Sequence, residues 1–308
     1  MTIFATSTSA FFDRSTQSLS SLRGQAEALQ NQIGSNSKLT KSSDDPLAAS
    51  LLRGLARQEA LGTVDAAAAN RATTDLNFTD AALNQFANYV TRAQELATQA
   101  ASSLLPAAQR ASIGTELAQI HTSLVSLANT RDSAGHALFG GDSAGDAYRI
   151  NVATGAAEYL GTGSAGELSL GDGQSVSRTL TGPEFLTFKD SAGNPTDLMT
   201  VIKSLSDALS GGAAGTAGVA STALGALSNG LDAITTAQTV VGSRLSWIDI
   251  STERQQTMSE ARNSEQSEIG SPDLASALAK LSELSTVLQA SQASFSKLAN
   301  LSIFDVLH

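Results

Sequence analysis

Apolar residues recur every three or four positions over the C-terminal stretch of the chain, Ser271–His308. The repeat has one gap of seven, inside which Ser291 stands, and its large members are Leu281, Leu284, Leu288, Phe295 and Leu298. This spacing places the side chains on one narrow stripe of an α-helix. The stretch therefore predicts a helix whose apolar stripe must pack on a partner helix.

A matching stripe lies at the opposite end of the sequence. Its members are Phe12, Leu19, Leu22, Ala26, Leu29 and Ile33. We expect a helix over residues 13–33, ended by Gly34 as a C′ glycine, and a loose or extended start over residues 1–11. The two matching stripes predict that the chain ends run together as a coiled coil.

Longer apolar repeats fill the chain between these ends. Asp45-Pro46 is typical of an N-cap followed by proline at the first helical position, and predicts a second helix. Strict steps of three and four recur over 113–127 and again over 224–248, with the latter helix continuing to about Ile269. Ser271 is expected to cap the last helix.

Residues 140–194 differ in character, because glycines separate short runs in which apolar and polar residues alternate. The runs cover 148–152, 167–170, 175–180 and 185–188. A period of two between turn residues indicates short β-strands. Asn194-Pro195 is expected to start a short helix, followed by a Gly/Ala-rich linker.

These elements predict a mainly α fold: a long antiparallel helical bundle or coiled coil formed by the N- and C-terminal parts, with a small β-rich inserted domain. In chain order we expect a coiled-coil part (1–45), a helical core part (46–139), a β-rich outward domain (140–194), a short helix and linker (195–218), the returning core part (219–269) and the second coiled-coil part (270–308).

Composition removes several classes of function. The 308 residues carry a formal net charge of −10, which argues against a nucleic-acid partner. The chain has no cysteine, so disulfides and thiolate metal sites are excluded. It has no run of eighteen apolar residues, so we expect no membrane insertion. Its first residues lack the basic and apolar regions of a secretory signal peptide.

Candidate chemistry is sparse. Gly141-Asp142-Ser143-Ala144-Gly145 fits the Gly-x-Ser-x-Gly pattern, but a strand-like run follows it where a hydrolase needs a helix. His121 lies off the helical stripe and is expected at the surface or partly packed. Asp44 and Asp45 are a candidate carboxylate pair, although the start of a helix also favours acids. We expect no enzyme activity, no cofactor and no bound metal.

The terminal helices are candidates for an interface between subunits. Their stripes are shorter and more polar than the inner ones, and no third helix in the chain is an evident partner, so an isolated pair would be marginal. The interface residues that we expect are Phe12, Leu19, Leu22, Leu29, Ile33, Leu281, Leu284, Leu288, Phe295, Leu298, Ile303, Phe304 and Leu307.

Several segments resemble the flagellin superfamily. They are 29–35 with 42–48, 92–100, 127–130 with the Leu-Phe-Gly-Gly turn of 135–141, 241–249, and the ending 301–307 with its Phe-Asp-x-Leu pattern. Within that superfamily, the turn and the ending resemble subunits that join hook to filament more than flagellin itself. Residues 142–220 do not carry the resemblance.

The resemblance implies a structural subunit of the bacterial flagellum, located outside the cell and exported without a cleaved signal peptide. It implies partners as well: copies of itself in a ring or helical oligomer, other hook-associated proteins, flagellin, and an export chaperone on the C-terminal helix.

Three alternatives stay open at this point. The chain could be a minor flagellin that forms filament, since the architecture would be shared. It could be an enzyme with its site in residues 140–195, where Ser143 is the best candidate. It could also be an adhesin whose outward domain binds surface material.

Overall fold

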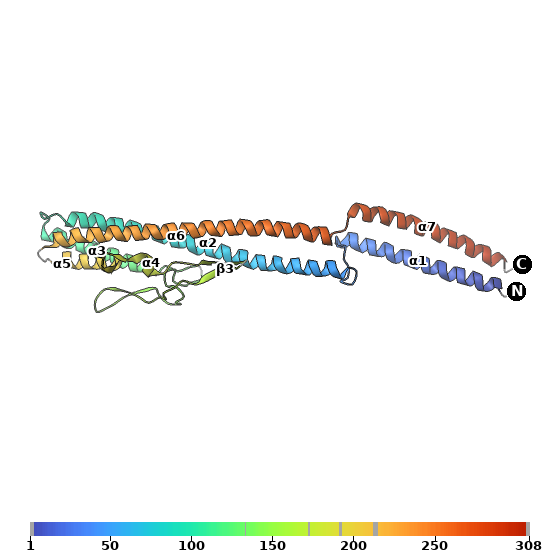
Figure 1. Cartoon of the computed structure of the whole chain (residues 1–308), viewed down its shortest axis with the longest axis horizontal. Coiled ribbons are helices and arrows are strands. Elements are labelled where there is room, and N and C mark those ends of the chain that lie inside the picture. Colours follow the sequence, from blue (N-terminus) through green and yellow to red (C-terminus); the bar gives the residue numbers. More distant parts are fainter. Residues whose placement is uncertain (1–2, 133, 172, 191–192, 212–214, 306–308) are drawn as a thin grey trace. The chain divides into compact units, whose positions relative to one another are not determined.

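The computed structural model describes residues 3–305 except 133, 172, 191–192 and 212–214, and describes side chains for Ala10 and for residues 12–297 outside these gaps. Long helices dominate it (Figure 1). The helices are α1 (Ile3–Ser35), α2 (Pro46–Ala100), α3 (Ala107–Ala128), α4 (Gly182–Leu186), α5 (Leu198–Ser210), α6 (Thr216–Gly270) and α7 (Leu274–Asp305).

Chain contacts divide the molecule into two compact units, which we call the terminal unit and the core unit. The terminal unit holds Met1–Ala60 and Thr257–His308, and the core unit holds Leu61–Gln256. In the terminal unit α1 and α7 lie side by side (Figure 1). The finer domain boundaries expected from the sequence, and the outward position of residues 140–194, stay predictions.

The start of α2 agrees with the predicted cap. Asp45 Oδ1 accepts the backbone N–H groups of Leu47 at 3.1 Å and Ala48 at 3.0 Å. These bonds satisfy two of the donors that the first turn of a helix leaves open. The neighbouring Asp44 instead accepts bonds from Thr40 and Lys41 in the preceding turn, so the two carboxylates have separate structural partners.

Both predicted ends of the first helix are wrong. The first helix already begins at Ile3, so residues 3–11 are helical rather than extended. It continues past Gly34, because Asn36 takes the left-handed position with φ +50°. The N–H of Ser37 then bonds Gln32 O and the N–H of Asn36 bonds Ile33 O, which is a Schellman motif.

The last helix is capped by Asp273 rather than Ser271. Asp273 Oδ1 accepts the N–H groups of Ala275 and Ser276, and α7 begins at Leu274. A carboxylate reaches these N–H groups and also favours the positive end of the helix dipole. The predicted break in the chain at 270–273 is therefore present, with a different capping residue.

The strands form three separate antiparallel hairpins in the core unit. They pair β1 (Tyr148–Ile150) with β2 (Ala157–Tyr159), β3 (Glu167–Gly171) with β4 (Gln174–Ser177), and β5 (Thr187–Lys189) with β6 (Pro195–Asp197). β2, β6 and the short α4 were not expected from the sequence. Pro195 lies in β6 instead of starting a helix, and Asp197 caps α5.

One hydrophobic core joins the hairpins to the helices of the core unit. Phe86 of α2, Phe139 of the Leu-Phe-Gly-Gly turn and Phe185 of α4 are fully buried, with ring centroids 4.9–5.9 Å apart. Leu170 and Val176 of the second hairpin belong to the same core. Phe139 therefore anchors the turn, while Gly141 takes the positive φ of +64° that the turn requires.

Candidate assembly interface on the terminal helices

The apolar stripe of α1 faces α7. Half-buried positions on α1 recur without a miss in steps of three and four: Phe12, Ser15, Leu19, Leu22, Ala26, Leu29 and Ile33. Steps of this kind keep side chains on one face of a helix, as in a coiled coil. The predicted apolar stripe of the first helix is therefore the face that α1 presents to α7.

The same pattern runs along α7. Its buried or half-buried positions are Ala277, Leu281, Leu284, Leu288, Ser291 and Phe295. Phe12 and Phe295 meet edge to face, with ring centroids 5.4 Å apart and planes at 86°. An aromatic pair in this geometry contributes about 0.5–1.5 kcal/mol beyond the area it buries.

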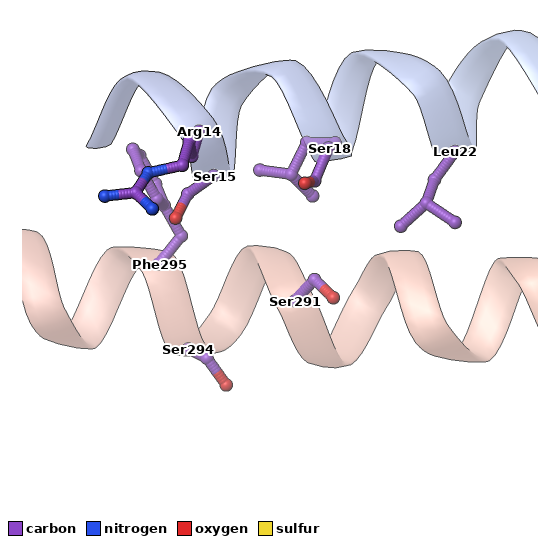
Figure 2. Close-up of a pocket in the computed structure, with 8 residues that line it drawn as sticks. Arg14, Ser15, Ser18, Leu22, Ser291, Ser294 and Phe295 are labelled. Carbon is purple, nitrogen blue, oxygen red and sulfur yellow. The ribbon is translucent and has the colours of Figure 1, made fainter. Parts of the chain in front are cut away.

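A cleft of about 350 Å³ opens between the two helices, next to this aromatic pair. It is lined by Arg14, Ser15, Ser18, Leu19, Leu22, Ser291, Ser294 and Phe295 (Figure 2). Ser15 and Ser291 hold stripe positions at which most other turns carry leucine, isoleucine or phenylalanine. The cleft follows from these two small residues, because neither fills the space that a leucine would fill.

Arg14 gives the cleft a positive charge. Its Nε donates to Ala10 O at 3.0 Å, within α1. Among the described side chains, none with a carboxylate forms an ion pair with Arg14. The cleft therefore combines an apolar floor of Leu19, Leu22 and Phe295 with a cation whose terminal nitrogens can bind an anion.

The predicted interface residues lie along these facing helices as far as they are described. Leu284 is buried, and the other described members, from Phe12 to Phe295, are half-buried. The side chains of Leu298, Ile303 and Phe304, and all of Leu307, lie outside the described residues. The structure pairs the two stripes within one chain, and their role between subunits stays a prediction.

Ser15 and Ser291 were not among the predicted interface residues. Their signal was in the sequence, because each fills a stripe position inside a gap of seven.

Exposed apolar residues at the start of α2 were also missed. Leu47 is 73% exposed and Leu51 is 47% exposed, and the two lie one turn apart on the same helix.

The Gly-x-Ser-x-Gly segment forms a turn. Ser143 Oγ accepts the N–H of Gly145 at 3.4 Å, and the N–H of Ser143 donates to Gly140 O. Ser143 shares a cavity of about 130 Å³ with Asp132 and His136. However, no hydrogen bond joins His136 to Ser143 among the described atoms, so the base–nucleophile contact of a serine hydrolase is missing there.

The structure also bears on two further kinds of site, a metal centre and a membrane-spanning helix. No cluster of three or more His, Asp or Glu side chains suited to a metal ion occurs among the described residues. Within the same residues, no helix is both long and apolar enough to span a bilayer.

Arg178 forms a polar network in the core unit that the sequence did not reveal. Its guanidinium bonds Asp75 of α2 at 3.1 Å and also bonds Asp132, and both carboxylates are almost fully buried. Burial raises the pKa of Asp75, and the charge of Arg178 opposes that rise. Arg244, from a segment of the flagellin resemblance, donates to Thr179 O at 2.8 Å. These residues tie the second hairpin to α2 and α6.

His121 is buried, against the expectation of a surface or partly packed residue. Its Nε2 has no hydrogen-bond partner among the described atoms. Burial lowers the pKa of this imidazole, and the nearby Lys203 lowers it further. The residue therefore belongs to the packing of α3 on α5 and has the chemistry of a neutral buried base.

Comparison with known proteins supports the resemblance found in the sequence motifs. No family model matches the chain. Flagellar hook-associated protein 3 of Salmonella typhimurium is 29% identical over 135 residues, which cover 44% of this chain and 43% of that protein. The protein of the same name from Escherichia coli is 30% identical over 110 residues, covering 36% and 35%. The matches thus span less than half the length of these relatives.

Solved structures share the fold over more of the chain. A flagellar hook-associated protein from Vibrio parahaemolyticus matches with a TM-score of 0.66 at 20% identity, over 74% of this chain and 100% of that one. FlgL of Xanthomonas campestris matches with a TM-score of 0.62 at 18% identity, over 69% and 99%. The mainly α fold with small antiparallel hairpins is therefore confirmed, as is the resemblance to flagellar hook-associated proteins.

Proposed function

We propose that this chain, which resembles flagellar hook-associated protein 3 in sequence and shares the fold of solved hook-associated proteins, is a structural subunit of the bacterial flagellum that joins hook to filament. The observation that carries the proposal is the pair of heptad stripes on α1 and α7, only half buried within the chain. A half-buried stripe leaves apolar surface that a neighbouring helix can cover.

Assembly occurs by ordering on contact. The terminal helices carry few charges, namely Asp13, Arg14, Arg23 and Glu27 on α1 and Lys280, Glu283, Lys297 and Asp305 on α7. Burying charged groups away from water is costly. Because the terminal helices carry few of them, a neighbouring subunit can cover these helices at little such cost. Docking on neighbouring subunits supplies the free energy that ordering the helices requires.

The proposed partners follow from this role. They are copies of this chain in a ring or helical oligomer, other hook-associated proteins on one side and flagellin on the other. An export chaperone covers the C-terminal helix before assembly, and the chain reaches the outside through the flagellar channel without a cleaved signal peptide. The hairpins of residues 140–194 face outward, and the chain has no catalytic role.

Imaging the flagella of the bacterium that makes this chain tests the proposal. A peptide tag is inserted in the exposed turn at Val152–Gly155 and labelled with an antibody. We expect one band of label where the hook meets the filament, and hooks without filaments when the gene is deleted. Label along the whole filament would identify a flagellin instead, and unlabelled flagella would overturn the proposal.

A further inference from the structure

We propose that the cleft between α1 and α7 receives the start of α2 from a second copy of this chain. In this contact Leu47 enters the cleft, and the carboxylates of Asp44 and Asp45 approach Arg14. The inference rests on the proposed function, because it names the partner surface for the terminal helices.

The cleft has the size and chemistry for one large apolar side chain. Leu19, Leu22 and Phe295 give it an apolar lining. Ser15 and Ser291 leave the space open (Figure 2). A side chain from outside would complete the knobs-into-holes packing that the two serines interrupt. Arg14 at the rim requires an anionic neighbour once water is excluded, since an unpaired buried cation is costly.

The start of α2 offers both features together. Leu47 is the most exposed of the large apolar side chains described in the terminal unit, at 73%, and Leu51 extends the same face by one turn. Asp44 and Asp45 precede it and are exposed. In each of these carboxylates one oxygen accepts the local hydrogen bonds, and the other accepts none among the described atoms. The surface is thus apolar beside negative charge, complementary to an apolar cleft beside positive charge.

The two surfaces are different parts of the same chain. A contact between unlike patches is heterologous, so it repeats from copy to copy and generates a ring or an open helix. A subunit at a junction needs an arrangement of that kind. A contact of the cleft with itself would give only a closed dimer.

Disulfide trapping in isolated flagella tests the contact. The chain has no natural cysteine, so a double variant, Ser18→Cys with Ser50→Cys, carries the only thiols in this chain and keeps Leu47. Ser50 is exposed and lies one turn after Leu47 on α2. Oxidation is expected to give bands at two, three and more chain masses on a non-reducing gel. Ser20→Cys with Ser50→Cys is the matched control, because Ser20 is exposed on α1 and does not line the cleft. Equal bands for both pairs, or none for either, would overturn the inference.

Variants that keep the helices test it independently. Arg14→Ala and Leu47→Ser should each lower the amount of this chain retained in flagella by about tenfold. Arg23→Ala and Leu278→Ser are their controls, since Arg23 is exposed on α1 outside the cleft and Leu278 is 54% exposed on α7. Losses equal to those of the controls would contradict the contact.

Filling the cleft separates docking from folding. Ser291→Leu should slow protease digestion of α1 and α7 in the purified chain, yet reduce its retention in flagella, whereas Ser291→Ala should leave retention unchanged. Normal retention of Ser291→Leu would overturn the inference. Wild-type chain at the junction together with these negative results would leave the proposed function standing, and absence of the wild-type chain from flagella would remove both.

Discussion

At the scale of residues, the core unit combines buried charge and a buried neutral base. Arg178 neutralises two carboxylates that come from α2 and from the turn after α3. Removing one partner from such a group leaves an uncompensated buried charge, which is strongly destabilising. His121 differs, because its burial and the nearby charge of Lys203 favour the uncharged imidazole.

Acid should destabilise the core unit through His121. Burial holds the pKa of His121 below its ordinary value of 6.5, so the unfolded chain binds more protons as pH falls through 6.5. The free energy of unfolding that the neutral His121 contributes is constant above pH 6.5. It decreases below pH 6.5, by at most about 1.4 kcal/mol per pH unit. Urea unfolding at pH 7.5 and 5.5, followed by the fluorescence of Trp247, measures the loss.

Two variants assign that loss to the buried imidazole. His121→Gln should remove most of the difference between the two pH values, whatever its effect on stability at pH 7.5. His136→Gln is the control, because the His136 side chain is about half exposed, and it should keep the difference. If both variants respond to pH as the wild type does, His121 is not the source.

At the scale of elements, the close approach of α3 to α5 depends on Gly114. A Cβ at this position would lie 2.9 Å from Ser206 O and 3.0 Å from Ser210 N, and closer still to Ser210 Oγ. Ser206 Oγ also donates to Gly114 O at 2.7 Å across the same contact. Gly114→Ala should therefore destabilise the core unit by about 1–3 kcal/mol, because backbone atoms of α5 must shift.

Gly225→Ala in α6 is the matched control for this substitution. A Cβ there meets nothing within 4 Å, so alanine should raise stability by up to about 1 kcal/mol through its higher helix propensity. The midpoint of urea unfolding compares the two variants. A Gly114→Ala protein as stable as the Gly225→Ala protein would show that α3 and α5 are not held this close.

The long helices were predictable because their apolar residues repeat every three or four positions over many turns. The helix ends and short strands were not predictable, since they depend on single side chains. Local sequence favours Gly34 over Asn36 for the left-handed position, yet Asn36 takes it. Asp273 and Ser271 are almost equally good capping residues, so sequence does not choose between them. β6 contains a proline, and its pairing with Thr187–Lys189 is set by the core rather than by any alternation of its own.

The candidate site could be predicted only in part for a similar reason. The stripes of α1 and α7 were evident from the spacing of Phe12, Leu19, Leu288 and their neighbours. The cleft was not, because it results from what Ser15 and Ser291 leave unfilled when the two helices meet. The network of Arg178 was also hidden, since its carboxylates lie 103 and 46 residues away along the chain.

At the scale of the whole molecule, the two units should differ in resistance to protease. The core unit has many fully buried apolar side chains, among them Phe86, Phe139 and Phe185. In α1 and α7 the described side chains that are buried are Ala277 and Leu284 only. Local opening costs least where few apolar side chains are buried, so the terminal helices should open first.

Limited proteolysis of the purified chain should therefore remove residues 1–45 and 270–308 and leave a resistant fragment that contains the core unit. Cleavage is expected first in the exposed segment after Asn36 and near Ser271, where α1 and α6 end. Mass spectrometry of the fragments reads the cut sites. Chain assembled in flagella is the control, and there both ends should resist digestion, because neighbouring subunits cover them. If both ends already resist in the purified chain, ordering on contact is wrong, and the stripes of α1 and α7 are satisfied by each other alone.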